Sequence, residues 1–136
     1  MVAVSDERGQ ALVFVVLLIG VAAASVTAIR AAQDMLVENA HVHRAGEAAV
    51  EAAAAAVADA YVARGDLSPK GVRALVADVD VVHRARTAAN ELAHANGAAP
   101  IESLALSCDD GRIEAHLELR RYPHRAGFAA SECSPR

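Results

Sequence analysis

The side chains that could do chemistry are six histidines, two cysteines and one short acidic run. His41 and His43 lie two residues apart in a predicted helix, so their rings would face apart. The other histidines show no H-x-x-x-H spacing, and Cys108 and Cys133 form no Cys-x-x-Cys pair. Zinc sites usually show spacings of these kinds. The histidines are therefore interpreted as solvated or packing residues, and no metal site is predicted.

The acidic run from Asp109 to Glu114 is too short for a calcium loop of the D-x-D-x-D-G-x₅-E type and fits a hairpin turn instead. The sequence has no Gly-rich phosphate loop and no nucleophile motif, and Ser107-Cys108 has no recognisable histidine partner. We therefore predict that the protein is not an enzyme, uses no cofactor and binds no small-molecule substrate. A net charge of −4 and a pI near 5.8 argue against a nucleic-acid partner.

The composition indicates which elements would position these residues. Alanine accounts for 34 of the 136 residues, tryptophan is absent, and tyrosine and phenylalanine together number four. Alanine favours helix and lets helices approach closely, but its burial removes little apolar area from water. We expect long helices joined by small-residue contacts, in at most one compact domain with appendages.

The chain begins with a polar leader at residues 1–9, followed by an apolar stretch at residues 10–29 that carries no charge. About 20 apolar residues in a helix cross a hydrocarbon core of roughly 30 Å. A transmembrane helix is therefore predicted. A buried helix of a soluble core and a cleaved secretion signal stay open as alternatives, although the leader is not basic and the apolar run is long for a signal. Arg8 and Arg30, one on each side, give no orientation.

The helical pattern continues through residues 30–64, an Ala-rich stretch without proline that is predicted to form a stalk. The sequence "GDLSPKG" then interrupts it, with Gly65 as a helix end and Ser68-Pro69 as the start of the next helix. This second helix is expected to cover part of residues 69–95. A short alternating run, "VADVDVV", leaves a strand open there, although helix is favoured.

Two runs of alternating apolar and polar residues surround Asp110-Gly111, which predicts a β-hairpin. The tail after this hairpin contains two prolines and a glycine, and it is expected to be irregular. An isolated hairpin is marginally stable in water, so its apolar face should pack on a helix. The predicted fold class is α+β, with residues 65–136 forming a small head of one helix, a hairpin and an irregular tail.

Several stretches resemble a known family. "ERGQALV" (Glu7 to Val13) resembles the N-terminal signature of TadE/TadG-like proteins, the pilin-like components of Tad (Flp) type IV pilus systems. The Ala-rich stretch from Leu36 to Val57 is similar to the corresponding part of that family, and "ANELAHANG" is similar to a later region. The resemblance covers about residues 6–60. It implies a type IV pilin-like layout and a single-pass protein of the bacterial cytoplasmic membrane, with its C-terminal region outside the cytoplasm. A place in a surface pilus is compatible with this layout.

The same resemblance implies a minor pilin or assembly component of a Tad/Flp-type pilus, with processing by a prepilin peptidase between Gly9 and Gln10. Pilin-like proteins commonly carry Glu five residues after the cleaved glycine, where the carboxylate neutralises the new amine of a neighbouring subunit. This sequence has Phe14 at that position. The departure favours an assembly or accessory role over that of a major structural pilin.

The partners expected for such a protein are the lipid bilayer, other Tad pilus or pilin-like subunits and assembly platform proteins. The transmembrane helix would pack against other subunits through its small residues: Gly20, Ala22, Ala23, Ala24 and Ser25. The alternative function is that of a secreted soluble binding protein, released when a signal peptide is cleaved.

The two cysteines depend on the compartment. If the head lies outside the cytoplasm, Cys108 and Cys133 could form a disulfide that closes a loop of about 25 residues. Such a bond would add about 3 kcal/mol of stability on the chain-entropy model and would tether the C-terminus. Two unpaired thiols are the alternative.

Overall fold

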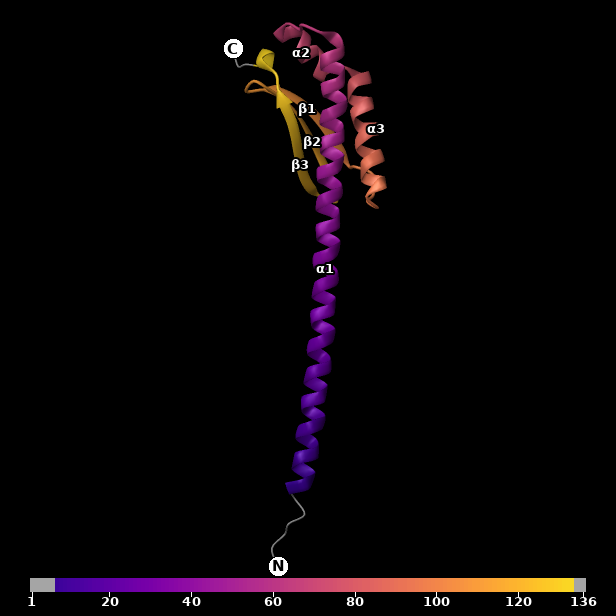
Figure 1. Ribbon diagram of the computed structural model, residues 1–136, viewed down its shortest axis with the longest axis vertical. Helices are drawn as coiled ribbons and strands as arrows, with labels where there is room; N and C mark the ends of the chain where they lie inside the picture. Colours follow the sequence, from indigo (N-terminus) through magenta and orange to yellow (C-terminus); the bar gives the residue numbers. More distant parts are fainter. Residues whose placement is uncertain (1–6, 134–136) are drawn as a thin grey trace, which may run out of the picture. The chain divides into compact units, whose positions relative to one another are not determined.

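The computed structural model describes residues 7–133, with side chains from residue 11 onward. The fold is α+β, as predicted: one long N-terminal apolar helix, two shorter helices and an antiparallel sheet. The elements, in chain order, are α1 (Glu7–Arg64), α2 (Pro69–Val76), α3 (Val79–Ala95), β1 (Ser103–Asp109), β2 (Arg112–Leu119), β3 (Tyr122–Ala129) and the 3₁₀ helix η1 (Ser131–Cys133). Figure 1 shows their order.

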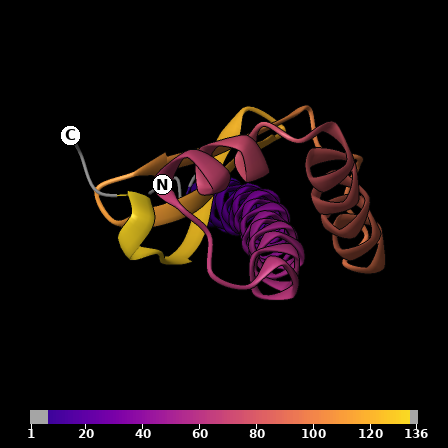
Figure 2. The same ribbon diagram turned by 90° about the horizontal axis from the view of Figure 1, so that it is seen from above.

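The chain divides into two compact units, residues 1–39 and residues 40–136. The first unit, in its described part, consists of the apolar half of α1. The second unit contains the remainder of α1 and every other described element. We call it the C-terminal unit. Its three helices cover one face of the sheet and leave the other face to solvent (Figures 1 and 2).

The ends of the helices follow from local sequence. α1 ends at Arg64 because Gly65 adopts a left-handed conformation with φ +70°, and its N–H donates to the carbonyl of Val62. The Ser68 side chain accepts a hydrogen bond from the Gly71 N–H at 3.2 Å, which caps α2, and proline occupies the first helical position. The sequence predicted both signals.

The sequence predicted one helix within residues 69–95, but this segment contains two helices, α2 and α3. The break lies at Ala77 and Asp78, because the Asp78 carboxylate accepts the Asp80 N–H at 2.9 Å and thereby starts α3. The alternating run "VADVDVV" is helical on both sides of this break and forms no strand. α3 buries Val81 and the alanines at positions 85, 89 and 93.

The three strands form a meander in the order β1-β2-β3. The predicted hairpin around Asp110-Gly111 is present, with Asp109 paired to Arg112. The segment expected to be irregular instead forms β3, which pairs with β2 from Tyr122 to Ala129. Pro123 and Gly127 weakened the strand signal in the sequence, but an edge strand tolerates both residues.

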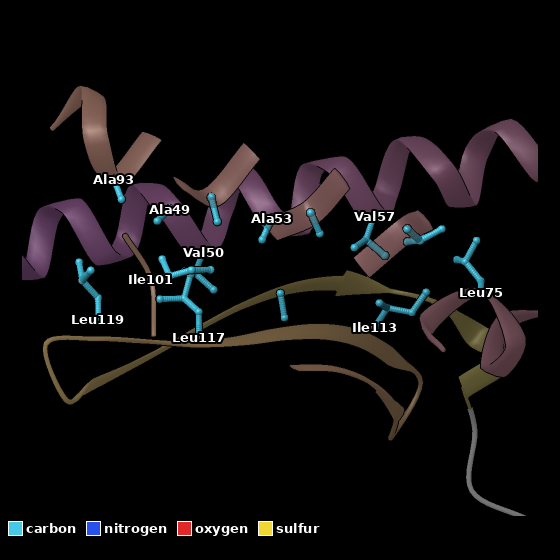
Figure 3. Close-up of a cluster of buried hydrophobic side chains, with 14 of the residues drawn as sticks. Ala49, Val50, Ala53, Val57, Leu75, Ala93, Ile101, Ile113, Leu117 and Leu119 are labelled. Carbon is cyan, nitrogen blue, oxygen red and sulfur yellow. The ribbon is translucent and has the colours of Figure 1, made fainter. Parts of the chain in front are cut away.

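The core of the C-terminal unit lies between the helices and the sheet (Figure 3). Alanines at four-residue spacing, together with valines and Leu75, supply the helical side, and branched side chains from β2 supply most of the other side. The buried alanines are Ala45, Ala49 and Ala53 in α1 and Ala85, Ala89 and Ala93 in α3, each with no exposed surface. The small side chains allow the helices to lie close to their neighbours, as the composition suggested.

Candidate functional site

The first candidate is the apolar half of α1, whose large side chains are uncovered. From Leu12 to Ile29 the large apolar residues are each more than half exposed, with values between 51% and 68%. The segment is long and apolar enough to cross a membrane, with a mean hydropathy of 2.8 in its most apolar window. This length and composition are compatible with a membrane-spanning helix or a signal anchor.

The polar side chains of this segment are satisfied within the helix. Ser25 donates its hydroxyl to the carbonyl of Val21 at 2.8 Å, and Thr27 donates to the carbonyl of Ala24 at 2.8 Å. In a hydrocarbon environment an unsatisfied hydroxyl would be costly, so these bonds make both residues acceptable in a spanning segment.

The small residues proposed for helix packing lie in the same segment. Gly20 has open space at its Cα, and residues 22–25 are exposed on the helix surface. Together with Leu12, Val13, Val16, Leu17, Val21 and Ala24, Gly20 lines a shallow apolar hollow. Phe14 is 67% exposed within the segment. Gly9 and Gln10 belong to the backbone of α1, but the surroundings of this predicted processing site lie outside the described residues.

The second candidate is the disulfide-bonded C-terminus. The structure joins Cys108 of β1 to Cys133 of η1, which are 25 positions apart in sequence, and the distance between their Cα atoms is 5.1 Å. Two backbone hydrogen bonds support the same closure, from Gly111 N–H to the carbonyl of Cys133 and from Ala130 N–H to the carbonyl of Gly111. The bond therefore fastens the end of the chain to the first hairpin.

A contact that the sequence did not reveal adds to this closure. The Tyr61 hydroxyl of α1 donates to Glu132 Oε2 at 2.9 Å, and the Tyr61 ring packs against Phe128 with centroids 5.7 Å apart. A hydrogen bond from its own backbone N–H, followed by that from Tyr61, lowers the pKa of the Glu132 carboxyl. These residues are 71 positions apart, so no local pattern could have paired them.

The third candidate is a buried histidine. His124 of β3 is only 8% exposed, and its ring lies against Gly46 of α1, where an added Cβ would come within 2.1 Å of Nε2. Burial and the neighbouring His43, whose ring centroid is 5.6 Å away, lower the pKa of His124, and Glu47 opposes this shift. Within the described residues Nε2 has no hydrogen-bond partner.

This cluster does not form a metal site. Gly46 occupies the space in front of His124 Nε2, so a cation could not approach that atom. Across residues 11–133, no group of three or more His, Cys, Asp and Glu side chains is arranged to hold a metal ion. His41 takes no part in the cluster, whereas His43 packs against Tyr122 at a centroid distance of 4.8 Å.

The fourth candidate is a Ser–His–Glu cluster on the open face of the sheet. Ser107 Oγ lies 3.3 Å from His116 Nε2, and Glu114 Oε2 lies 3.4 Å from the same nitrogen. In a catalytic triad the carboxylate holds Nδ1 while Nε2 receives the serine proton. Here both partners contact Nε2 and the imidazole is exposed, so the arrangement is a polar surface cluster.

The hairpin pattern in the sequence contains the information that places these three side chains together. The predicted hairpin register pairs Ser107 with Glu114 and places His116 two residues further along β2. Residues two apart on a strand, together with their cross-strand partners, share one face of a sheet. The histidine partner of Ser107 could therefore have been found from the hairpin alone.

The fifth candidate is a groove between the end of α1 and the start of α3. Alanines form its floor and charged residues its walls: Ala56, Asp59, Ala60, Ala63, Arg64, Asp78, Asp80 and Arg84. Arg64 and Asp78 form an ion pair across it, and the hydrogen bond from Arg64 is the main cause that lowers the pKa of the Asp78 carboxyl. The groove joins helices and contains no catalytic arrangement among its lining residues.

Comparison of the chain with models of protein families, with curated proteins and with solved structures finds no match.

Proposed function

We propose that this protein is a single-pass, pilin-like membrane protein that serves as a minor pilin or assembly component of a Tad/Flp-type pilus. The observation that carries the proposal is the uncovered apolar half of α1, which continues without a break into the helix of a small disulfide-bonded unit. A helix that is apolar on all sides requires lipid or other helices around it. The resemblance of Glu7 to Val13 to the TadE/TadG-like signature supports this choice among membrane proteins.

The disulfide supports the proposed orientation. Disulfides form and persist in oxidising compartments and are rare in the cytosol. The Cys108–Cys133 bond therefore favours a C-terminal unit that lies outside the cytoplasm, with the leader inside. Flanking arginines could not provide this orientation, because there is one on each side of the apolar stretch.

The proposed role is one of contacts between proteins. The small residues at positions 20 and 22–25 are exposed on α1, where another transmembrane helix could approach closely. Phe14 stands where a fibre subunit would carry a glutamate, which favours an accessory or assembly role. No catalytic step is part of this proposal.

The mature N-terminus and membrane extraction test the proposal together. Intact mass spectrometry of the purified full-length product should show a chain that starts at Met1 or at Gln10, and alkaline carbonate should leave it in the membrane. A start at Gln10 would identify processing by a prepilin peptidase. A start after about Ala24 or Ala28, with the protein in the soluble fraction, would refute the membrane role and support a secreted binding protein.

A thiol-labelling experiment tests the orientation separately. In intact cells, a membrane-impermeant maleimide should label Cys108 and Cys133 only after mild reduction from outside. Labelling of both thiols only after the cells are lysed, without any reductant, would place the C-terminal unit in the cytoplasm and contradict the proposal.

A further inference from the structure

The two hairpin turns of the C-terminal unit share one backbone geometry but use different residues. Both are two-residue loops, since Asp109 pairs with Arg112 and Leu119 pairs with Tyr122. In each loop both residues have positive φ: 47° and 72° at Asp110-Gly111, and 48° and 66° at Arg120-Arg121. This is the pattern of a type I′ turn, for which Asn-Gly and Asp-Gly are preferred.

The second turn therefore holds two bulky charged residues in a conformation that disfavours them. The β1–β2 turn of the same sheet uses the favoured Asp-Gly pair. An L side chain in the left-handed region is strained by contact between its Cβ and the backbone. Such strain is usually retained where the residue has a role beyond the fold. The pair Arg120-Arg121, which we call the arginine tip, is thus a candidate contact site.

The position of the arginine tip restricts what it can reach. Tyr122, the next residue, packs against His43, so the tip lies beside the first turns of α1 within the C-terminal unit. Arg121 is exposed, and among the described residues it forms no ion pair. Arg121 therefore presents a positive charge to whatever lies beside this end of the unit.

A surface of opposite charge exists on the same molecule. Along α1 in the C-terminal unit, a line of residues three or four apart is exposed on the side away from the buried alanines. It consists of Arg44, Glu47, Glu51 and Ala55. Glu47 and Glu51 are one helical turn apart, and neither forms an ion pair with another described residue. A like-charge pair at this spacing is unfavourable in isolation. Arg44 lies one turn from Glu47, whereas Glu51 has no cation within one turn of α1 and would be relieved by one.

We propose that the arginine tip of one copy binds the Glu47–Glu51 face of a second copy of this chain, with Arg121 supplying the principal contact. The inference rests on the proposed assembly role and names a partner for it. Because the two surfaces lie on different parts of the chain, the contact can close reciprocally between two copies or repeat head-to-tail from copy to copy. Charge complementarity of this kind fixes register and partner choice more than it adds affinity.

A charge-swap experiment tests the contact. Full-length copies with two different tags are co-expressed, solubilised in mild detergent and captured through one tag. Arg121→Glu alone and Glu51→Arg alone should each lower co-purification about fivefold, because each puts like charges opposite one another. Co-expression of the Arg121→Glu copy with the Glu51→Arg copy should restore it, because both possible contacts again join opposite charges.

Arg125→Glu is the matched control, since Arg125 is an exposed arginine of β3 away from the tip. It should leave co-purification unchanged. Arg121→Gly should raise the thermal unfolding midpoint of the C-terminal unit, because glycine relieves the strained φ, and yet lower co-purification. A higher unfolding midpoint together with lower co-purification would show that the variant loses the contact between copies and not its fold.

Several results would overturn the inference. Failure of the mixed pair to associate better than either variant alone would exclude this pairing of surfaces. If the swap fails while Arg121→Glu weakens flotation of the protein with vesicles of anionic phospholipid, the tip binds lipid instead. Membrane extraction of each variant is measured in parallel, so that loss of the membrane anchor, which would refute the proposed function, is read separately from loss of the contact.

Discussion

His124 is a buried histidine whose environment favours its neutral form. Burial and His43 lower its pKa, and no described residue accepts or donates at Nε2. The His124 ring packs tightly against α1, and at position 46 only glycine leaves room for it. A single side chain therefore couples the second hairpin to the helix, and its protonation should be opposed by folding.

Acidification should destabilise the C-terminal unit through His124. In the folded state its pKa lies below the unfolded value, so the unfolded chain binds more protons between these two pKa values. Stability should be complete above the unfolded pKa, near 6.5, and should fall as the pH decreases from there. The thermal unfolding midpoint, followed by near-ultraviolet circular dichroism between about pH 8 and 5, measures this.

Two substitutions make the assignment specific. His124→Gln should flatten the dependence on pH over this range, whatever it does to the midpoint itself. His116→Gln is the matched control, because His116 is exposed on the open face of the sheet, and it should leave the slope unchanged. An unchanged slope in the His124 variant would contradict the assignment.

Some contacts between single residues could be predicted from the sequence, and others could not. The pairing of Cys108 with Cys133 could be anticipated because only two cysteines exist. The contacts of Tyr61 with Glu132 and of Gly46 with His124 could not, because they join distant positions through the packing of α1 on the sheet. Such contacts are set by tertiary geometry, which residue types alone do not specify.

At the level of elements, the predictions were right where a local signal acts alone. Gly65, Ser68-Pro69 and Asp110-Gly111 each carry a turn or cap signal strong enough to place a boundary. The prediction of one helix within residues 69–95 was wrong at Asp78. An aspartate within a helical pattern also fits an exposed helical position, so the sequence alone did not identify it as the N-cap of α3. The prediction of an irregular tail was also wrong at β3, whose proline and glycine are acceptable only at a sheet edge.

Removal of the α2 cap should destabilise the C-terminal unit modestly. Ser68→Ala loses the hydrogen bond to the Gly71 N–H, and α2 buries Val72 and Leu75 completely. Loss of an N-cap typically costs about 1 kcal/mol. Thermal unfolding of the full chain in detergent should show a lower midpoint for Ser68→Ala.

The matched variant is Ser68→Asp, which keeps a capping oxygen and should leave the midpoint close to that of the natural sequence. Equal loss in both variants would show that the cap is not the cause, and that position 68 instead tolerates no substitution.

For the whole molecule, the disulfide is the main restraint at the C-terminus. It joins the last described helix to the first strand, and it cooperates with the Tyr61–Glu132 hydrogen bond to fasten this end to α1. Alanine supplies eight of the 19 buried hydrophobic residues in the described part of the chain, and each buries little apolar area. A covalent restraint should therefore matter more here than in a core made only of large side chains.

Loss of the disulfide should therefore be costly. The double substitution Cys108→Ser and Cys133→Ser should lower the free energy of unfolding by about 3 kcal/mol, the value expected for a loop of 25 residues. Denaturant unfolding of the full chain in detergent measures this loss. The natural chain should change its gel mobility on reduction and the double variant should not; the same unfolding midpoint with and without reductant would contradict the prediction.

The packing of α1 along the sheet has a mechanical consequence. The chain enters the C-terminal unit at Ala40, at one end of a helix whose buried residues from Ala49 to Val57 lie on the side of the sheet (Figure 3). A pull applied at that entry point, with the unit held elsewhere, would load the helix–sheet layer in shear. In shear, all the side-chain contacts between α1 and the sheet would resist the force together. A force that peeled the helix away from the sheet would instead break these contacts one at a time. A protein with this arrangement is suited to bear tension along its helix.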